Sequence, residues 1–112
     1  MSWLLVALGG ALGSVARHGL GLLLAGLAPA GTLAANLLGC GLIGYLHVRL
    51  GAEPARALLV TGFCGGFTTW SAFGLETARL AADGRLAAAA GYAALTLFLC
   101  LGAVAAGWAL AR

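Results

Sequence analysis

The chain has 112 residues, of which 62% are hydrophobic, and its six basic and three acidic residues give a formal net charge of +3. A soluble domain usually carries about a quarter charged residues, so this composition indicates a membrane protein instead. The basic residues are all Arg and are scattered along the chain, which excludes a nucleic-acid-binding patch. Helices of about 20 residues span a bilayer, so we expect one all-α transmembrane domain over residues 1–112.

Four apolar segments follow one another, and each is long enough to span a bilayer. In chain order they cover residues 3–27, 32–48, 57–75 and 86–110. Pro29 and Gly31 mark the first turn, and the loops 47–56 and 76–85 hold most of the charged residues. No Asp or Glu is therefore expected in the middle of the membrane. The spacing of Gly9 and Gly13 predicts close packing of the first segment against another helix.

The distribution of Arg residues gives almost no preference for one orientation in the membrane. Four spans put both termini on one side, with Arg49, Arg56 and Arg112, while Arg79 and Arg85 lie on the other. Because an excess of basic residues sets orientation, the count of three against two allows insertion both ways, and two oppositely oriented copies could then form a dimer. Alternatively, an intramembrane charge or a partner protein sets a single orientation.

The third segment contains Gly65 and Gly66 followed by Thr68 and Thr69, an unfavourable combination for a continuous helix. A break there would free backbone carbonyls, which a bilayer requires to be buried in protein or satisfied by water or an ion. A hard cation such as Na⁺ suits carbonyl oxygens. The alternative is an unbroken helix with a glycine packing face, and composition leaves both open.

Polar and aromatic side chains recur at helical spacing within the apolar segments. Residues four apart share a helix face. The candidate site residues are Asn36 in segment two, Trp70, Ser71 and Phe73 in segment three, and Tyr92, Thr96 and Cys100 in segment four. Amides and hydroxyls donate hydrogen bonds and aromatic ring edges carry positive potential, so together they are suited to a small anion. The alternative for each is interhelical hydrogen bonding or core packing.

Arg17 is the one strong charge well inside an apolar segment, which makes it a candidate for function. It is placed to draw anions into a vestibule. The alternatives are that it extends to the lipid headgroups or pairs with a backbone carbonyl.

At these positions the sequence resembles the Fluc (also called CrcB) family of fluoride channels. The resemblance rests on residues 9–17 (GGALGSVAR), 31–39 (GTLAANLLG), 62–73 (GFCGGFTTWSAF) and Glu76, in the same order along the chain. It implies an antiparallel, dual-topology homodimer in the cell's inner (plasma) membrane. It also implies two pores that export F⁻ passively from the cytoplasm, without enzyme activity.

The resemblance also implies particular residue roles. A structural Na⁺, which is not transported, would be held at the dimer centre by the backbone carbonyls of Gly65 and Thr68 where the third helix breaks. The pore residues would be Asn36, Trp70 and Phe73, with a polar track at Tyr92, Thr96 and Cys100. Trp70 stands where the family usually has Phe, and Ala72 where it usually has a hydroxyl residue.

Two other functions remain open on the sequence. One is a small dual-topology exporter of drugs or other organic cations, against which the expected lack of a central carboxylate argues. The other is an accessory subunit that packs through its glycines and transports nothing.

Overall fold

The computed structural model describes residues 1–27 and 29–112, and the regular structure it assigns over these residues is helical. The helices long and apolar enough to cross a membrane are α1 (Ser2–Leu23), α2 (Ala30–Arg49), the third span (Arg56–Ala82) and α5 (Leu86–Ala111). Twenty helical residues extend about 30 Å, the thickness of the hydrocarbon core. The predicted four-span architecture is confirmed, and the chain is a multi-pass membrane protein.

Two predicted boundaries differ from the structure. The first α-helix ends at Leu23, and residues up to Leu27 form a short 3₁₀ turn, η1 (Ala25–Leu27). The third span continues to Ala82, so the prediction that residues 76–82 form a loop is wrong. The turn comes later because Gly84 adopts the left-handed conformation (φ 78°) that closes a helix, and its N–H donates to the Ala81 carbonyl.

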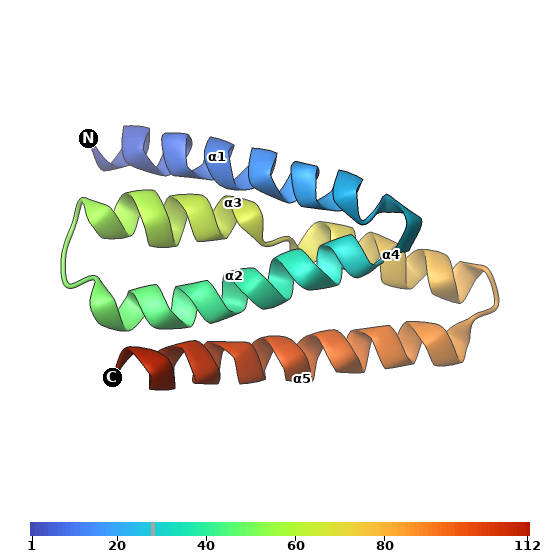
Figure 1. The fold of residues 1–112 in the computed structure, drawn as a ribbon. Helices are drawn as coiled ribbons and strands as arrows, with labels where there is room; N and C mark the ends of the chain where they lie inside the picture. Colours follow the sequence, from blue (N-terminus) through green and yellow to red (C-terminus); the bar gives the residue numbers. More distant parts are fainter. Residues whose placement is uncertain (28) are drawn as a thin grey trace.

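Consecutive spans run in opposite directions, and both termini lie at the same end of an elongated molecule of 47 × 28 × 21 Å (Figure 1). The third span consists of three pieces, namely the wide π-type helix η2 (Arg56–Cys64), α3 (Gly65–Phe67) and α4 (Trp70–Ala82). The first two pieces pack against α1, whereas α4 packs against α5. The interruption between α3 and α4 therefore moves the span from one neighbour to another.

Glycines allow the backbones to approach closely in two helix pairs. A methyl group on Gly13 of α1 would overlap the Phe63 carbonyl oxygen of η2, and one on Gly66 would overlap the Gly10 carbonyl oxygen. In the second pair, a methyl group on Gly107 of α5 would overlap the Gly41 carbonyl oxygen of α2. Small residues have this role in membrane helices because backbone contact replaces the hydrophobic drive that water supplies to soluble proteins.

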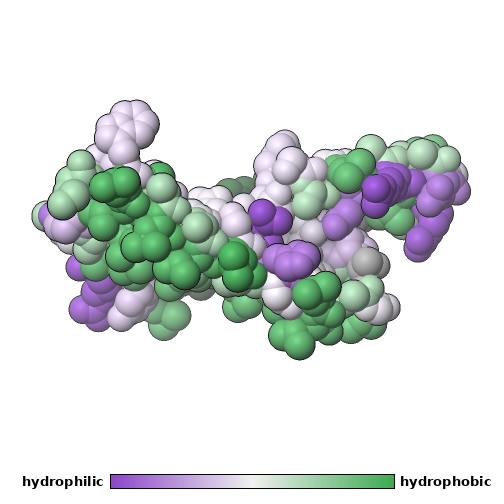
Figure 2. All heavy atoms as spheres, turned by 90° about the horizontal axis from the view of Figure 1, so that it is seen from above, coloured by the Kyte–Doolittle hydropathy of each residue, from purple (hydrophilic) through white to green (hydrophobic). Residues whose placement is uncertain are grey.

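Most large apolar side chains face outward. Trp3, Leu23 and Phe98 are 87%, 83% and 72% exposed, respectively. Figure 2 shows apolar surface over much of one face, with hydrophilic groups gathered at the ends and in a small patch near the middle. Such a surface is stable against lipid or another apolar protein surface, and the central hydrophilic patch marks where the spans are not simply lipid-facing.

Candidate functional site

The third span is interrupted at Thr68 and Thr69. Both residues are extended, with φ/ψ of −88°/155° and −149°/122°. The helix restarts at Trp70 because the Thr69 hydroxyl oxygen accepts a hydrogen bond from the Ala72 N–H at 3.2 Å, as an N-cap residue does. Of the two alternatives that composition left open, the broken helix is therefore the one observed. Gly65 remains helical, one turn before the break.

Asn36 of α2 holds the break in place. Its amide nitrogen donates to the Thr69 carbonyl oxygen at 2.9 Å, and its amide oxygen accepts from the Thr69 N–H at 2.7 Å. Asn36 is buried, so both bonds lie away from solvent and satisfy backbone groups that the interruption would otherwise leave unpaired. The second hydrogen of the amide nitrogen is still available to a ligand.

Not all carbonyls near the break are satisfied. The Cys64 carbonyl accepts from both the N–H and the hydroxyl of Thr68, and the Gly66 carbonyl accepts from Ser14 and from Arg17 Nε at 3.4 and 3.2 Å. Within the described part of the chain, no donor reaches the carbonyls of Gly65, Phe67 or Thr68. Unpaired carbonyls at a helix end are ligands for a hard cation.

A groove of about 370 Å³ lies beside the break, between α2, the third span and α5. Its lining includes five of the predicted pore residues, namely Asn36, Trp70, Phe73, Thr96 and Cys100. Thr96 is 5% exposed, and its hydroxyl oxygen is the one buried side-chain polar atom without a partner among the described residues. A buried hydroxyl without a partner is costly, so this groove is suited to a hydrogen-bonding guest.

Aromatic rings continue along one side of the groove. The rings of Trp70 and Phe73 are 5.0 Å apart at 59°, and those of Phe73 and Tyr92 are 5.3 Å apart at 55°. Tilted pairs expose positively polarised ring edges. Phe73 is buried, but Trp70 is 78% exposed on a single chain, so its indole projects beyond the four-helix unit.

Ser71 and Tyr92 are not among the residues that line the groove. The Ser71 hydroxyl is paired with the Thr69 hydroxyl at 3.2 Å on an exposed part of α4. The Tyr92 hydroxyl donates to Glu76 at 2.8 Å. Both residues still neighbour the groove, through Thr69 and Phe73 respectively.

Glu76 lies within the third span, near its end, and not in a loop as the sequence predicts. It is half-buried in α4, and its two oxygens accept from the hydroxyls of Thr32, at 2.7 Å, and Tyr92, at 2.8 Å. The difference arises because α4 continues past Leu75, where the predicted segment ends. The carboxylate links α2, α4 and α5, six residues before the end of α4.

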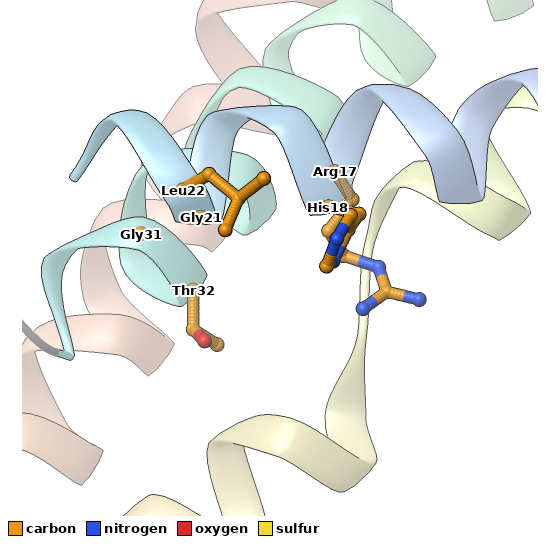
Figure 3. Close-up of a pocket in the computed structure, with 6 residues that line it drawn as sticks. All are labelled: Arg17, His18, Gly21, Leu22, Gly31 and Thr32. Atoms are coloured by element: carbon orange, nitrogen blue, oxygen red, sulfur yellow. The ribbon is translucent and has the colours of Figure 1, made fainter. Parts of the chain in front are cut away.

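Arg17 lies at a second pocket, of about 180 Å³, between α1 and the start of α2. Figure 3 shows its side chain directed from α1 toward the chain that joins α3 and α4, with Thr32 on the α2 side. The bond from Arg17 Nε to Gly66 O matches the carbonyl pairing considered above as an alternative. The guanidinium keeps further donors, so pairing with the carbonyl and attraction of anions are compatible.

Three residues outside the predicted site also contribute to this region: Thr69, Glu76 and Cys40. Thr69 was predictable in principle, because a threonine directly before an apolar helical stretch is an N-cap signal. Cys40 shares a helix face with Asn36, and lines the groove.

Four spans, an interrupted third span and a mainly apolar groove with a few polar groups, edged by aromatic rings, define a small helical membrane protein with a groove beside its broken span. Comparison with known families gives a match over residues 4–108 to the family described as CrcB-like protein, Camphor Resistance (CrcB). The chain belongs to this family.

Curated relatives cover nearly the whole chain. One from Paracoccus denitrificans is 44% identical, with 99% of this chain and 94% of the relative aligned. Others from Gloeobacter violaceus and Chlorobium phaeobacteroides are 46% and 45% identical, with 94% and 83% of this chain and 89% and 78% of the relative aligned. All three are named fluoride-specific ion channel FluC. These names describe channels and not enzymes.

Proposed function

We propose that the chain is a fluoride channel that lets F⁻ leave the cytoplasm passively across the plasma membrane. The observation that carries the proposal is the unpartnered, buried Thr96 hydroxyl in a groove shared with Asn36 and Phe73. The names of the relatives supply the identity of the anion.

The groove offers replacements for the water that a small anion loses. Fluoride is strongly hydrated, so a path must present donors in place of its hydration shell. The Thr96 hydroxyl and the second hydrogen of the Asn36 amide are neutral donors, and ring edges add weaker positive potential. Neutral donors bind an anion less tightly than a buried cation does, and conduction requires binding weak enough for release.

A second copy in antiparallel orientation would complete the path. Two features of the single chain support this part of the proposal. Trp70 lines the groove with a side chain that is 78% exposed, and no donor among the described residues reaches the carbonyls of Gly65 and Thr68. A two-fold axis beside the break would give two equivalent pores.

Na⁺ fits the carbonyls at the break as a structural ion. Gly65 and Thr68 from each copy would offer four oxygens, and a hard monovalent cation would satisfy groups that are otherwise costly in hydrocarbon. The proposed ligands are backbone oxygens, so side-chain changes at Thr68 are expected to matter less than changes to the backbone. Fluoride flux that is unaffected by complete removal of Na⁺ would contradict the assignment.

Dual topology is tested by reporters fused to the C-terminus. Arg49 ends α2, Arg56 begins the third span and Arg112 follows α5, whereas Arg79 and Arg85 flank the turn between α4 and α5, so three basic residues stand against two. We expect both orientations in a host without a related partner, and a bias to one after two Lys are added beside Arg112. One orientation for the unmodified chain would contradict an antiparallel homodimer.

A proton-coupled exporter of organic cations is a second candidate, and the half-buried Glu76 is the observation that favours it. Both oxygens of Glu76 already accept hydrogen bonds, so a cation would have to displace Thr32 or Tyr92. Purified protein in liposomes separates the candidates. A channel releases F⁻ without a proton gradient, an exporter moves organic cations and needs that gradient, and an accessory subunit moves neither.

A further inference from the structure

Two cysteines meet in the groove from different helices. Cys40 of α2 and Cys100 of α5 both line it. The two helices pack closely beside them, since a methyl group on Gly41, next to Cys40, would lie 3.8 Å from the carbonyl oxygen of Ala103, three residues beyond Cys100. The third cysteine, Cys64, is 1% exposed and does not line the groove.

The pair lies next to the proposed anion ligands. Cys40 follows Asn36 by four residues on α2, and Cys100 follows Thr96 by four on α5, so each thiol is about one helical turn, or 6 Å, from a ligand. The unpartnered Thr96 hydroxyl shows that this part of the groove has unused hydrogen-bonding capacity. Two soft ligands and a polar neighbour therefore line one space from two different helices.

We propose that Cys40 and Cys100 form a binding site for a thiophilic cation that prefers two thiolate ligands, represented by Hg²⁺, and that its occupation closes the groove to anions. Soft thiolates select such cations over the hard cations that carbonyls bind. The binding step stands independently of the transport role, whereas the closure rests on the proposed fluoride path.

The charge balance favours a divalent soft cation. Each thiol loses its proton to water as a sulfur–mercury bond forms, so two S–H bonds break, two S–Hg bonds form, and nothing is oxidised or reduced. The bis-thiolate complex of Hg²⁺ is neutral, which suits a low-dielectric site because a buried net charge is costly there. A monovalent soft cation between two thiolates would leave one negative charge, and we expect it to bind more weakly.

Mercury stoichiometry tests the binding step. The full-length protein in detergent is treated with HgCl₂ and desalted in the presence of a weak competing monothiol, and bound mercury and remaining free thiols are counted. We expect one retained Hg²⁺ per chain and the loss of two thiols. Cys40→Ala and Cys40→Ser are expected to lose the retained ion, whereas Cys64→Ala keeps it. Equal retention in wild type and both Cys40 variants would overturn the site.

Fluoride efflux from liposomes tests the closure with the same variants. We expect Hg²⁺ to reduce efflux at least tenfold in wild type and in Cys64→Ala, and to leave efflux through Cys40→Ala within twofold of its untreated rate. Retained mercury with unchanged efflux would overturn the closure. A wild type with no efflux before treatment would overturn the transport role, and the mercury count would then decide the binding site alone.

Discussion

Asn36 has two expected roles, one in holding the break and one in binding a ligand, and a single substitution tests both. Its amide holds the Thr69 backbone at the break through both a donor and an acceptor, and one N–H remains for a ligand. We expect Asn36→Asp to abolish fluoride flux, because a carboxylate loses the donor to Thr69 O and repels F⁻. Flux per folded protein, after size-exclusion chromatography in detergent, checks this, with neutral Asn36→Ser as the control for charge. Normal flux through well-folded Asn36→Asp would remove this residue from the pathway.

Thr96 allows function and stability to be distinguished. Its hydroxyl is buried without a partner, so Thr96→Val removes an unsatisfied group while nearly preserving shape. We expect flux to fall at least tenfold while thermal stability stays equal or rises by up to about 1 kcal/mol, since an unmade hydrogen bond is a cost to the fold. Lower stability together with unchanged flux would mean that the hydroxyl serves packing and not anions.

The residues of the site were easier to predict from the sequence than the hydrogen-bond partner of each one. Asn36, Trp70, Phe73, Thr96 and Cys100 share one groove, as their helical spacing and the family resemblance indicated. The sequence did not reveal that Asn36 binds the Thr69 backbone or that Glu76 bridges Thr32 and Tyr92. Those contacts depend on the position of each helix along the axis of its neighbour. The spacing of polar and apolar residues in the sequence does not determine that position.

At the scale of elements, the break in the third span works because its two halves have different neighbours. The first half lies against α1 through backbone contacts at glycines, and the second packs on α5 through Phe73 and Tyr92. Composition made a break and an unbroken helix equally plausible. The anchoring of Thr69 by Asn36 on a separate helix favours the break, and this was not visible from the third segment alone.

The contact between α1 and η2 is testable with a matched glycine pair. A methyl group on Gly13 would overlap the Phe63 carbonyl oxygen, whereas one on Gly19, in the same helix, meets nothing within 4 Å. We expect Gly13→Ala to destabilise the protein by about 1–3 kcal/mol and Gly19→Ala to have little effect or a slight stabilising one. Thermal unfolding in detergent measures both, and equal effects would contradict this packing.

At the scale of the whole molecule, the most unusual features of the single chain lie at its surface. The carbonyls of Gly65 and Thr68, which no donor reaches among the described residues, lie beside a half-exposed break, and Trp70 projects outward. In hydrocarbon such carbonyls need a partner, which the proposed second copy and cation would supply.

A substitution at Gly65 tests this assembly without disturbing the packing within the single chain. A methyl group on Gly65 or on Gly91 meets nothing within 4 Å, and both residues are exposed and helical. We expect Gly65→Val to weaken dimerisation and flux and Gly91→Val to leave both near wild type. Molar mass by light scattering in detergent, corrected for bound detergent, reports the dimer. A fully dimeric, active Gly65→Val would place the interface elsewhere.

The most direct test of the central claim is efflux from liposomes that contain the purified protein, loaded with KF and KCl and followed with fluoride and chloride electrodes. The account predicts that a K⁺ ionophore triggers rapid fluoride release without a proton gradient, at least a hundredfold faster than chloride release. It also predicts that Asn36→Asp abolishes that release. Fluoride retention by liposomes containing correctly folded wild-type protein, or equal release of the two anions, would contradict it.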